Sequence, residues 1–159
     1  MAVIRNCILP DDLAYDIPQD QWARFLPNGL LEFGVTDVGQ TLAGKFQTIS
    51  FRRTPPQHVG SGRAIALLES AKWLSPFRAA VPGTVVAVNK ELLGRPALVN
   101  FDPYGDGWVL RLRPDEPLPW IRGDAAREEY SLRLQQTFRS VAGVNDDFWC
   151  VHCSDWDAT

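Results

Sequence analysis

The sequence predicts a mainly β domain, a sandwich or flattened barrel of short strands, with short helices and one longer helix near its C-terminus. Twelve glycines and twelve prolines in 159 residues favour short strands separated by turns. Several short runs alternate apolar and polar side chains or are rich in β-branched residues, as half-buried and buried strands are. Because 45% of the residues are hydrophobic, a chain of this length can bury a substantial core in one domain.

The first clear element is a hairpin. "WARF" (22–25) and "LLEFGV" (30–35) read as strands on either side of "LPNG". Asn28-Gly29 is a strong hairpin signal, because both residues tolerate the positive φ angles of a tight turn. We therefore expect two adjacent antiparallel strands here.

A short helix is expected directly after this hairpin. Thr36 can accept a hydrogen bond as its N-cap, and Asp37 suits the first turn of a helix that runs to Ala43. Gly44 is a natural C-terminal stop. Further strands are predicted at 46–51, 63–70, 84–89 and 108–113, with a loop at 52–62, a turn-rich return at 75–83 and a short helix or turn from residue 90.

Residues 124–140, "DAAREEYSLRLQQTFRS", are the best helix candidate in the chain, with Asp124 as its cap. The predicted division is a domain over 1–123 that includes an N-terminal extension, followed by this helix and an irregular tail over 124–159. The apolar stripe of the helix is expected at Ala125, Tyr130, Leu132, Leu134 and Phe138.

Lys72 stands between the strand predicted at 63–70 and the return at 75–83, which places it at or near a hairpin tip. A tip keeps the amine in water, where a modifying enzyme can reach it. From the spacing alone, a solvated turn lysine is the commoner interpretation.

Composition excludes several classes of partner. The net charge is −3, and no Lys/Arg cluster reaches the density of a nucleic-acid footprint. No run of 18 apolar residues exists, so no membrane partner is expected. The N-terminus meets Pro10, Asp11 and Asp12 too early for a signal peptide, which favours a cytoplasmic location.

Three collinear segments carry a resemblance to a known family. "FGVTDVGQTLAGK", "ESAKWLSPFRAAVPGTVVAVN" and "LVNFDPYGDGWVLRLR" resemble, in order and spacing, segments of glycine cleavage system H proteins. The resemblance implies a lipoyl-domain-like fold, the barrel-sandwich hybrid, with lipoate amide-linked to Lys72. It also implies a non-catalytic carrier, whose swinging arm brings a bound intermediate and electrons from one partner enzyme to the next.

The resemblance assigns roles to the neighbours of Lys72. Glu69 and Ser70 are expected to be recognised by a lipoate ligase or lipoyltransferase, although both can equally be solvated residues at a strand end. Trp73 is expected to lie beside the arm or on a docking surface, with an exposed turn aromatic as the plainer interpretation. Biotin is disfavoured as the cofactor, because biotin domains flank their lysine with methionines and here Ala71 and Trp73 do so.

The chain departs from the H-protein pattern in several places. The family's "HEW" or "H.W" is replaced by Gln21-Trp22 within "DQWARF", and a tryptophan follows the lysine. With the N-terminal block "CILPDDLAYD", the long C-terminal extension and "ES.KW", these departures resemble the H-like lipoate-binding proteins of sulfur oxidation. That subgroup implies sulfur cargo and a heterodisulfide-reductase-like complex as partner. The alternative is a true glycine cleavage H protein, which serves a decarboxylase, an aminomethyltransferase and a dihydrolipoyl dehydrogenase.

Cys7, Cys150 and Cys153 are too few and too uneven for a disulfide framework. "WCVHC" resembles a disulfide isomerase motif, but only six residues follow it, so no thioredoxin-like site is expected. With His152 the two cysteines give three potential zinc ligands where a structural site needs four, and no metal site is predicted. Free thiols are the simplest interpretation; exchange with lipoate is the alternative.

Overall fold

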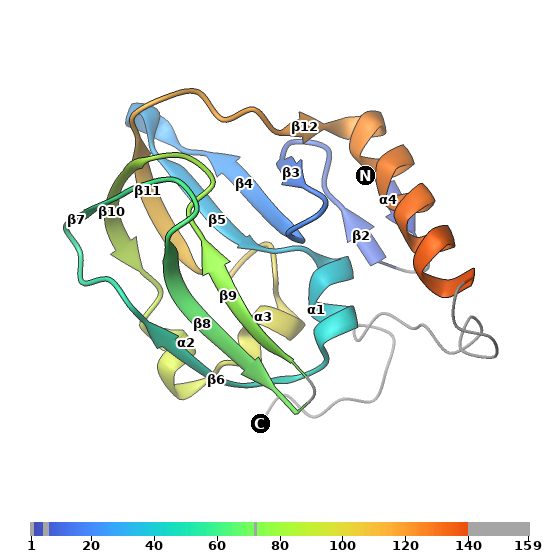
Figure 1. The fold of residues 1–159 in the computed structure, drawn as a ribbon, viewed down its shortest axis with the longest axis horizontal. Coiled ribbons are helices and arrows are strands. Elements are labelled where there is room, and N and C mark those ends of the chain that lie inside the picture. The colour runs from blue at the N-terminus through green and yellow to red at the C-terminus, as the bar shows by residue number, and fades with distance from the viewer. Residues whose placement is uncertain (1, 5–6, 72, 140–159) are drawn as a thin grey trace.

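The computed structural model describes residues 2–4, 7–71 and 73–139. Two sheets form the body (Figure 1). The smaller sheet has the strand order β6-β8-β9 and the larger has the order β12-β3-β4-β5-β11-β10-β7. The strands are β1 Ala2–Ile4, β2 Cys7–Leu9, β3 Ala14–Asp16, β4 Gln21–Phe25, β5 Leu31–Val35, β6 Phe46–Phe51, β7 Gln57–Val59, β8 Ala64–Ser70, β9 Leu74–Arg78, β10 Gly83–Val88, β11 Leu110–Pro114 and β12 Ile121–Arg122. The helices are η1 Pro27–Gly29, α1 Asp37–Ala43, α2 Glu91–Gly94, α3 Leu98–Phe101 and α4 Gly123–Arg139.

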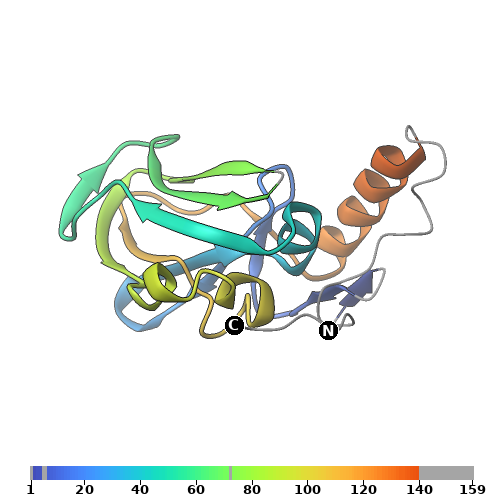
Figure 2. The same cartoon turned by 90° about the horizontal axis from the view of Figure 1, so that it is seen from below.

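The main core lies between the two sheets, which appear as stacked layers in Figure 2. Ile65, Leu68 and Phe77 come from the smaller sheet, while Phe33 and Leu112 come from the larger one. Burial of these apolar side chains is the main force that holds the two layers together. The mainly β sandwich predicted from the sequence is confirmed.

The predicted hairpin and first helix are both confirmed. Strands β4 and β5 pair in antiparallel register, and Asn28 and Gly29 both have positive φ in the turn between them. The Thr36 hydroxyl accepts a hydrogen bond from the Gly39 N–H at 3.0 Å, and Gly44 ends helix α1 with φ of 80°. Local sequence was sufficient in these segments because caps and tight turns depend on neighbouring residues only.

A second apolar cluster lies beneath helix α4 and the N-terminal strands, and includes Leu9, Leu13 and Trp22. Among the α4 side chains that the structure describes, Ala126 and Tyr130, one helical turn apart, are fully buried. The prediction of Ala125 and Leu132 as core positions was wrong, because both are exposed. Tyr130, also predicted as a core position, is buried. Successive helix residues are about 100° apart, so the face that contains Tyr130 also contains Ala126, four residues earlier, and leaves Ala125 and Leu132 outside it. The side chains of Asp124, Leu134 and Phe138 lie outside the part described.

Two strands formed where the sequence predicted loop or return. Strand β9 contains Pro76, which argued against a strand, and β7 falls within the predicted loop. Both are edge strands of their sheets. An edge strand tolerates proline because the missing N–H is not needed on its open side. None of the helices found among the described residues combines the length and the apolar character that a membrane span requires.

Candidate functional site

The turn between β8 and β9 is the tip of a regular hairpin. Glu69 pairs with Leu74, and the Ser70 N–H donates to the Trp73 carbonyl at 2.8 Å. Ala71 and Trp73 are both exposed at this tip. Lys72, which lies between them in the chain, is outside the described residues, and its predicted attachment role stays a prediction.

Ser70 anchors the tip to the body. Its side chain is buried and donates to the carbonyl of Ala43, the last residue of α1, at 2.7 Å. The same oxygen accepts from the Trp73 N–H at 3.1 Å. Ser70 is therefore built into the tip, whereas Glu69 is exposed at the strand end and available to a partner.

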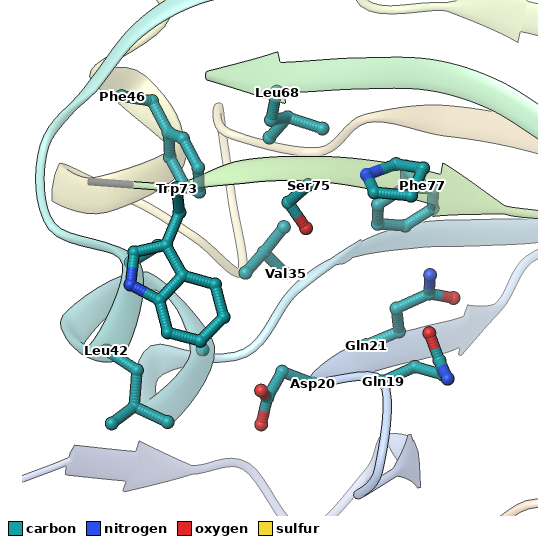
Figure 3. A pocket seen from close by; sticks show the side chains of 13 residues that line it. Gln19, Asp20, Gln21, Val35, Leu42, Phe46, Leu68, Trp73, Ser75 and Phe77 are labelled. Atoms are coloured by element: carbon teal, nitrogen blue, oxygen red, sulfur yellow. The ribbon is translucent and has the colours of Figure 1, made fainter. Parts of the chain in front are cut away.

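A small cavity lies directly beside the tip (Figure 3). It measures about 50 Å³, room for a few water molecules, and lies next to a Trp73 indole that is 52% exposed. Figure 3 shows the Trp73 ring reaching over helix α1 toward Leu42, with Asp20 and Gln21 across from it. The lining residues are Gln19, Asp20, Gln21, Val35, Gly39, Leu42, Ala43, Phe46, Leu68, Trp73, Ser75, Pro76 and Phe77.

Asp20 is the charged residue of this cavity wall. Its carboxylate accepts from both terminal nitrogens of Arg133, with Nη2 at 3.0 Å from Oδ2, and from the Tyr130 hydroxyl at 2.9 Å. Burial raises the pKa of the Asp20 carboxyl above its ordinary value, while the hydrogen bonds from Arg133 and Tyr130 oppose this rise. The C-terminal helix thereby holds a polar group at the edge of the cavity.

A relay of hydroxyls connects this carboxylate to helix α1. Since Tyr130 donates to Asp20, the Thr36 hydroxyl, 2.8 Å from the Tyr130 oxygen, donates to Tyr130. The same Thr36 hydroxyl oxygen also accepts a hydrogen bond from the Gly39 N–H. Burial raises the pKa of Tyr130 well above its ordinary value, so this phenol stays protonated and able to donate.

Asn100 holds in place two backbone segments that contribute residues to the cavity lining. Its side-chain oxygen accepts from the Phe46 N–H at 2.8 Å, and its amide nitrogen donates to Gln40 Oε1 at 3.0 Å and to the Gly44 carbonyl at 2.9 Å. It thereby joins the end of α1 to the start of β6, and both Ala43 and Phe46 line the cavity. The segment "LVNFDPYGDGW" has a structural role at this point.

Sequence reasoning missed Asp20, Arg133 and Asn100 as site residues. Asp20 stands two residues before Trp22, the spacing of histidine to tryptophan in "H.W", so this spacing was the available signal. Arg133 and Asp20 are joined only by the tertiary fold, 113 residues apart in the chain. No sequence pattern reports such a distant pair.

Cys7 is the one cysteine that lies within the described residues. Cys7 is buried, with its sulfur 3.6 Å from the Thr41 hydroxyl oxygen. Cys150 and Cys153 lie outside the described residues, so their predicted roles stay predictions. Within the described part of the chain, no three His, Cys, Asp or Glu residues are grouped to hold a metal ion.

Fold and site together define a class of protein, a lipoyl-domain-like β-sandwich whose exposed hairpin tip adjoins a small cavity. A sequence profile described as "Glycine cleavage H-protein" matches residues 13–135. The chain belongs to the glycine cleavage H-protein family.

Individual relatives agree with this assignment. The chain is 40% identical over 156 residues to glycine cleavage system H protein 3 of Aquifex aeolicus, covering 94% of this chain and 91% of that protein. It is 44% identical over 111 residues to H protein 2 of the same organism, covering 69% of this chain and 68% of that protein. A crystal structure of an H protein from Mycobacterium marinum matches with a TM-score of 0.69 at 23% identity, over 77% of this chain and 99% of that one. This structural match confirms the fold.

The names of these relatives bear on the expected cargo. The two Aquifex relatives are named glycine cleavage system H proteins, and their names support the glycine cleavage alternative better than the sulfur-oxidation prediction. Proteins of this family are carrier components of a multienzyme system.

Proposed function

We propose that this protein is a lipoyl carrier of a glycine cleavage system, with lipoate amide-linked to Lys72. The observation that carries the proposal is the β8–β9 tip, where Ser70 anchors the turn and Ala71 and Trp73 are exposed. A lysine between two exposed residues at an anchored turn fits covalent attachment, because the modifying enzyme can reach its amine without unfolding the sheet.

In this proposal the cofactor supplies the chemistry and the residues around the tip position it. Lipoate would supply a dithiolane that accepts two electrons and a transferable group. Ser70 and the β8–β9 pairing hold the chain on either side of Lys72 in place. An extended lysyl-lipoyl arm of about ten bonds, each of about 1.5 Å, reaches partner active sites while the body stays docked.

Recognition by other proteins would use the exposed residues of the tip. Glu69 and Trp73 are exposed and can contact a lipoate ligase or lipoyltransferase, and Trp73 can also shield the arm. The proposed partners in the cycle are the decarboxylase, the aminomethyltransferase and the dihydrolipoyl dehydrogenase of glycine cleavage. The proposed location is the cytoplasm, and the carrier itself catalyses no step.

A second candidate is sulfur carriage for a heterodisulfide-reductase-like complex. It is favoured by two features of the cavity: Asp20 stands at the spacing of the missing histidine, and Trp73 lies beside the opening. Because Asp20 is paired with Arg133, the cavity wall carries a paired carboxylate where the family pattern has an imidazole.

Glycine–bicarbonate exchange with the decarboxylase of the same organism tests the first proposal against the second. The lipoylated protein is expected to support exchange. Lys72→Arg should abolish it, and Lys90→Arg, at an exposed site on another loop, should not. A fully lipoylated protein that supports no exchange would overturn the glycine cleavage assignment and leave the sulfur carrier as the function.

A further inference from the structure

Four arginines surround one open hollow at the end of the small sheet farthest from the tip. The hollow has a volume of about 500 Å³. It is formed by the segment that follows β6, the start of β8 and the end of β9. The lining residues are Arg52, Arg53, Gly62, Arg63, Ala64, Leu67 and Arg78.

The backbone around the hollow is held by hydrogen bonds. The Arg52 N–H donates to the Ile65 carbonyl at 2.7 Å, and the Arg63 carbonyl accepts from the Ala79 N–H at 2.9 Å. The Arg78 guanidinium donates to the Gly62 carbonyl at 3.0 Å. The four cations are therefore presented by a fixed frame of paired strands.

The described residues do not neutralise the charge of the hollow. None of its lining residues is acidic, and no salt bridge joins the four arginines to a carboxylate in the described ranges. The chain as a whole carries a net charge of −3, so this concentration of positive charge is local. Like charges held close together repel one another, and a bound anion would relieve that repulsion.

Arg53 adds a second, independent observation. Its Nε atom is buried and has no hydrogen-bond acceptor among the described residues. Because Nε is closed to solvent, an anion in the hollow would contact Arg53 through its terminal N–H groups, which guanidinium groups present to planar or tetrahedral oxyanions.

We propose that this hollow binds an oxyanion of the phosphate class that carries at least two negative charges. The proposal is independent of the lipoyl carrier function. Leu67, the lining residue of the hollow nearest the tip along β8, lies three residues before Ser70, about 10 Å at about 3.3 Å per residue, and the arginines lie farther away, so a ligand there leaves the arm free. The hollow is large enough for a pyrophosphate or the phosphate chain of a nucleotide.

Titration with inorganic pyrophosphate, followed by two-dimensional NMR at low ionic strength without divalent metal, tests the proposal. Saturable shifts in the amides of 52–53, 62–64 and 78 are expected at millimolar or lower pyrophosphate. Arg52→Gln with Arg78→Gln, both exposed side chains, should weaken binding by about tenfold or more, because two charge-assisted donors are lost. Arg95→Gln with Arg127→Gln removes the same charge from exposed sites outside the hollow and should leave binding unchanged.

A parallel titration with ATP identifies the kind of molecule that supplies the phosphate. ATP binding with the same shifts would assign a phosphate-chain site, and tighter binding of ATP than of pyrophosphate would show that a base also contacts the hollow. The proposal would be overturned if pyrophosphate caused no shifts or shifts that do not saturate. It would also be overturned if the control variant, Arg95→Gln with Arg127→Gln, weakened binding as much as the Arg52/Arg78 variant does. An effect of the Arg52/Arg78 pair confined to docking on a partner enzyme would overturn it as well, and would assign the hollow to an acidic protein face.

Discussion

The two walls of the cavity beside the β8–β9 tip are built differently. On the tip side, Trp73 is 52% exposed and Leu74 is 60% exposed, and Ser70 supplies the side-chain hydrogen bonds to the body. Away from the exposed tip, Asp20 in the cavity wall and Asn100, which holds the lining residue Phe46, each make three or more hydrogen bonds with distant elements. One wall is open to other proteins, and the other is fixed.

The difference corresponds to what a carrier requires. A modifying enzyme has to reach the tip, so exposed apolar area is retained there at the expense of local stability. The fixed wall needs no rearrangement when a group arrives, because its polar atoms are already oriented by the fold. We therefore expect substitutions in the fixed wall to affect stability, and substitutions at the tip to affect modification.

Asn100→Ala should have the largest effect on the fixed wall. It removes the acceptor of the Phe46 N–H and the donor to Gln40 and Gly44, all in a buried site. We expect the free energy of unfolding to fall by about 3 kcal/mol, measured by urea denaturation. Asn100→Asp keeps the acceptor but places a buried carboxylate against the oxygens of Gln40 and Gly44, so its loss should be at least as large. An Ala variant within experimental error of wild type would show that the wall is not held as described.

Arg133→Gln should have the next largest effect. It leaves the Asp20 carboxylate partly buried without its cation, and we expect a loss of about 2 kcal/mol in the free energy of unfolding. Adding Asp20→Asn should recover part of this loss, because the uncompensated charge is removed. Arg127→Gln, exposed on the same helix, is the control. If the losses of Arg133→Gln and Asp20→Asn simply add, the two residues are not coupled.

Ser70→Ala should have a smaller effect on stability and a clear effect at the tip. It deletes the bond to the Ala43 carbonyl and the acceptor of the Trp73 N–H, and we expect a loss of about 1.5 kcal/mol. Lipoylation, followed by mass spectrometry with a purified ligase, should also slow. Ser50→Ala, on the exposed side of β6, should change neither. Unchanged lipoylation at reduced stability would limit Ser70 to a purely structural role.

Trp73→Ala should change stability least. Half of the side chain is already in water, so the free energy of unfolding is expected to change by no more than about 0.5 kcal/mol. The same denaturation assay checks it, with Trp22→Phe in the buried second cluster as the destabilised reference. A loss larger than that of Ser70→Ala would mean that Trp73 belongs to the core, and the contrast between the two walls would fail.

Much of the fold could be predicted from local sequence, and the site only in part. The β4–β5 turn and helix α1 follow from Asn28-Gly29 and from the Thr36 cap, where neighbouring residues decide the conformation. Strand β9 was not predicted, because Pro76 is acceptable only on an edge and sequence does not show which strands are edges.

For the site as well, local sequence predicts only the residues that are close together in the chain. Trp73 and Ser70 could be found because they are close to Lys72 in sequence. The pair of Asp20 with Arg133 and the contacts of Asn100 could not, because they join elements that are far apart in the chain. In these cases the backbone topology, rather than any local pattern, brings the groups together.

The central claim is that residue 72 carries lipoate, and intact mass with peptide mapping of the protein purified from its own host tests it most directly. A lipoyl increment confined to Lys72, absent from Lys72→Arg and retained in Lys90→Arg, is the predicted result. An unmodified Lys72 in protein from actively growing cells would contradict the carrier account and leave an interaction module with the fold of a lipoyl domain.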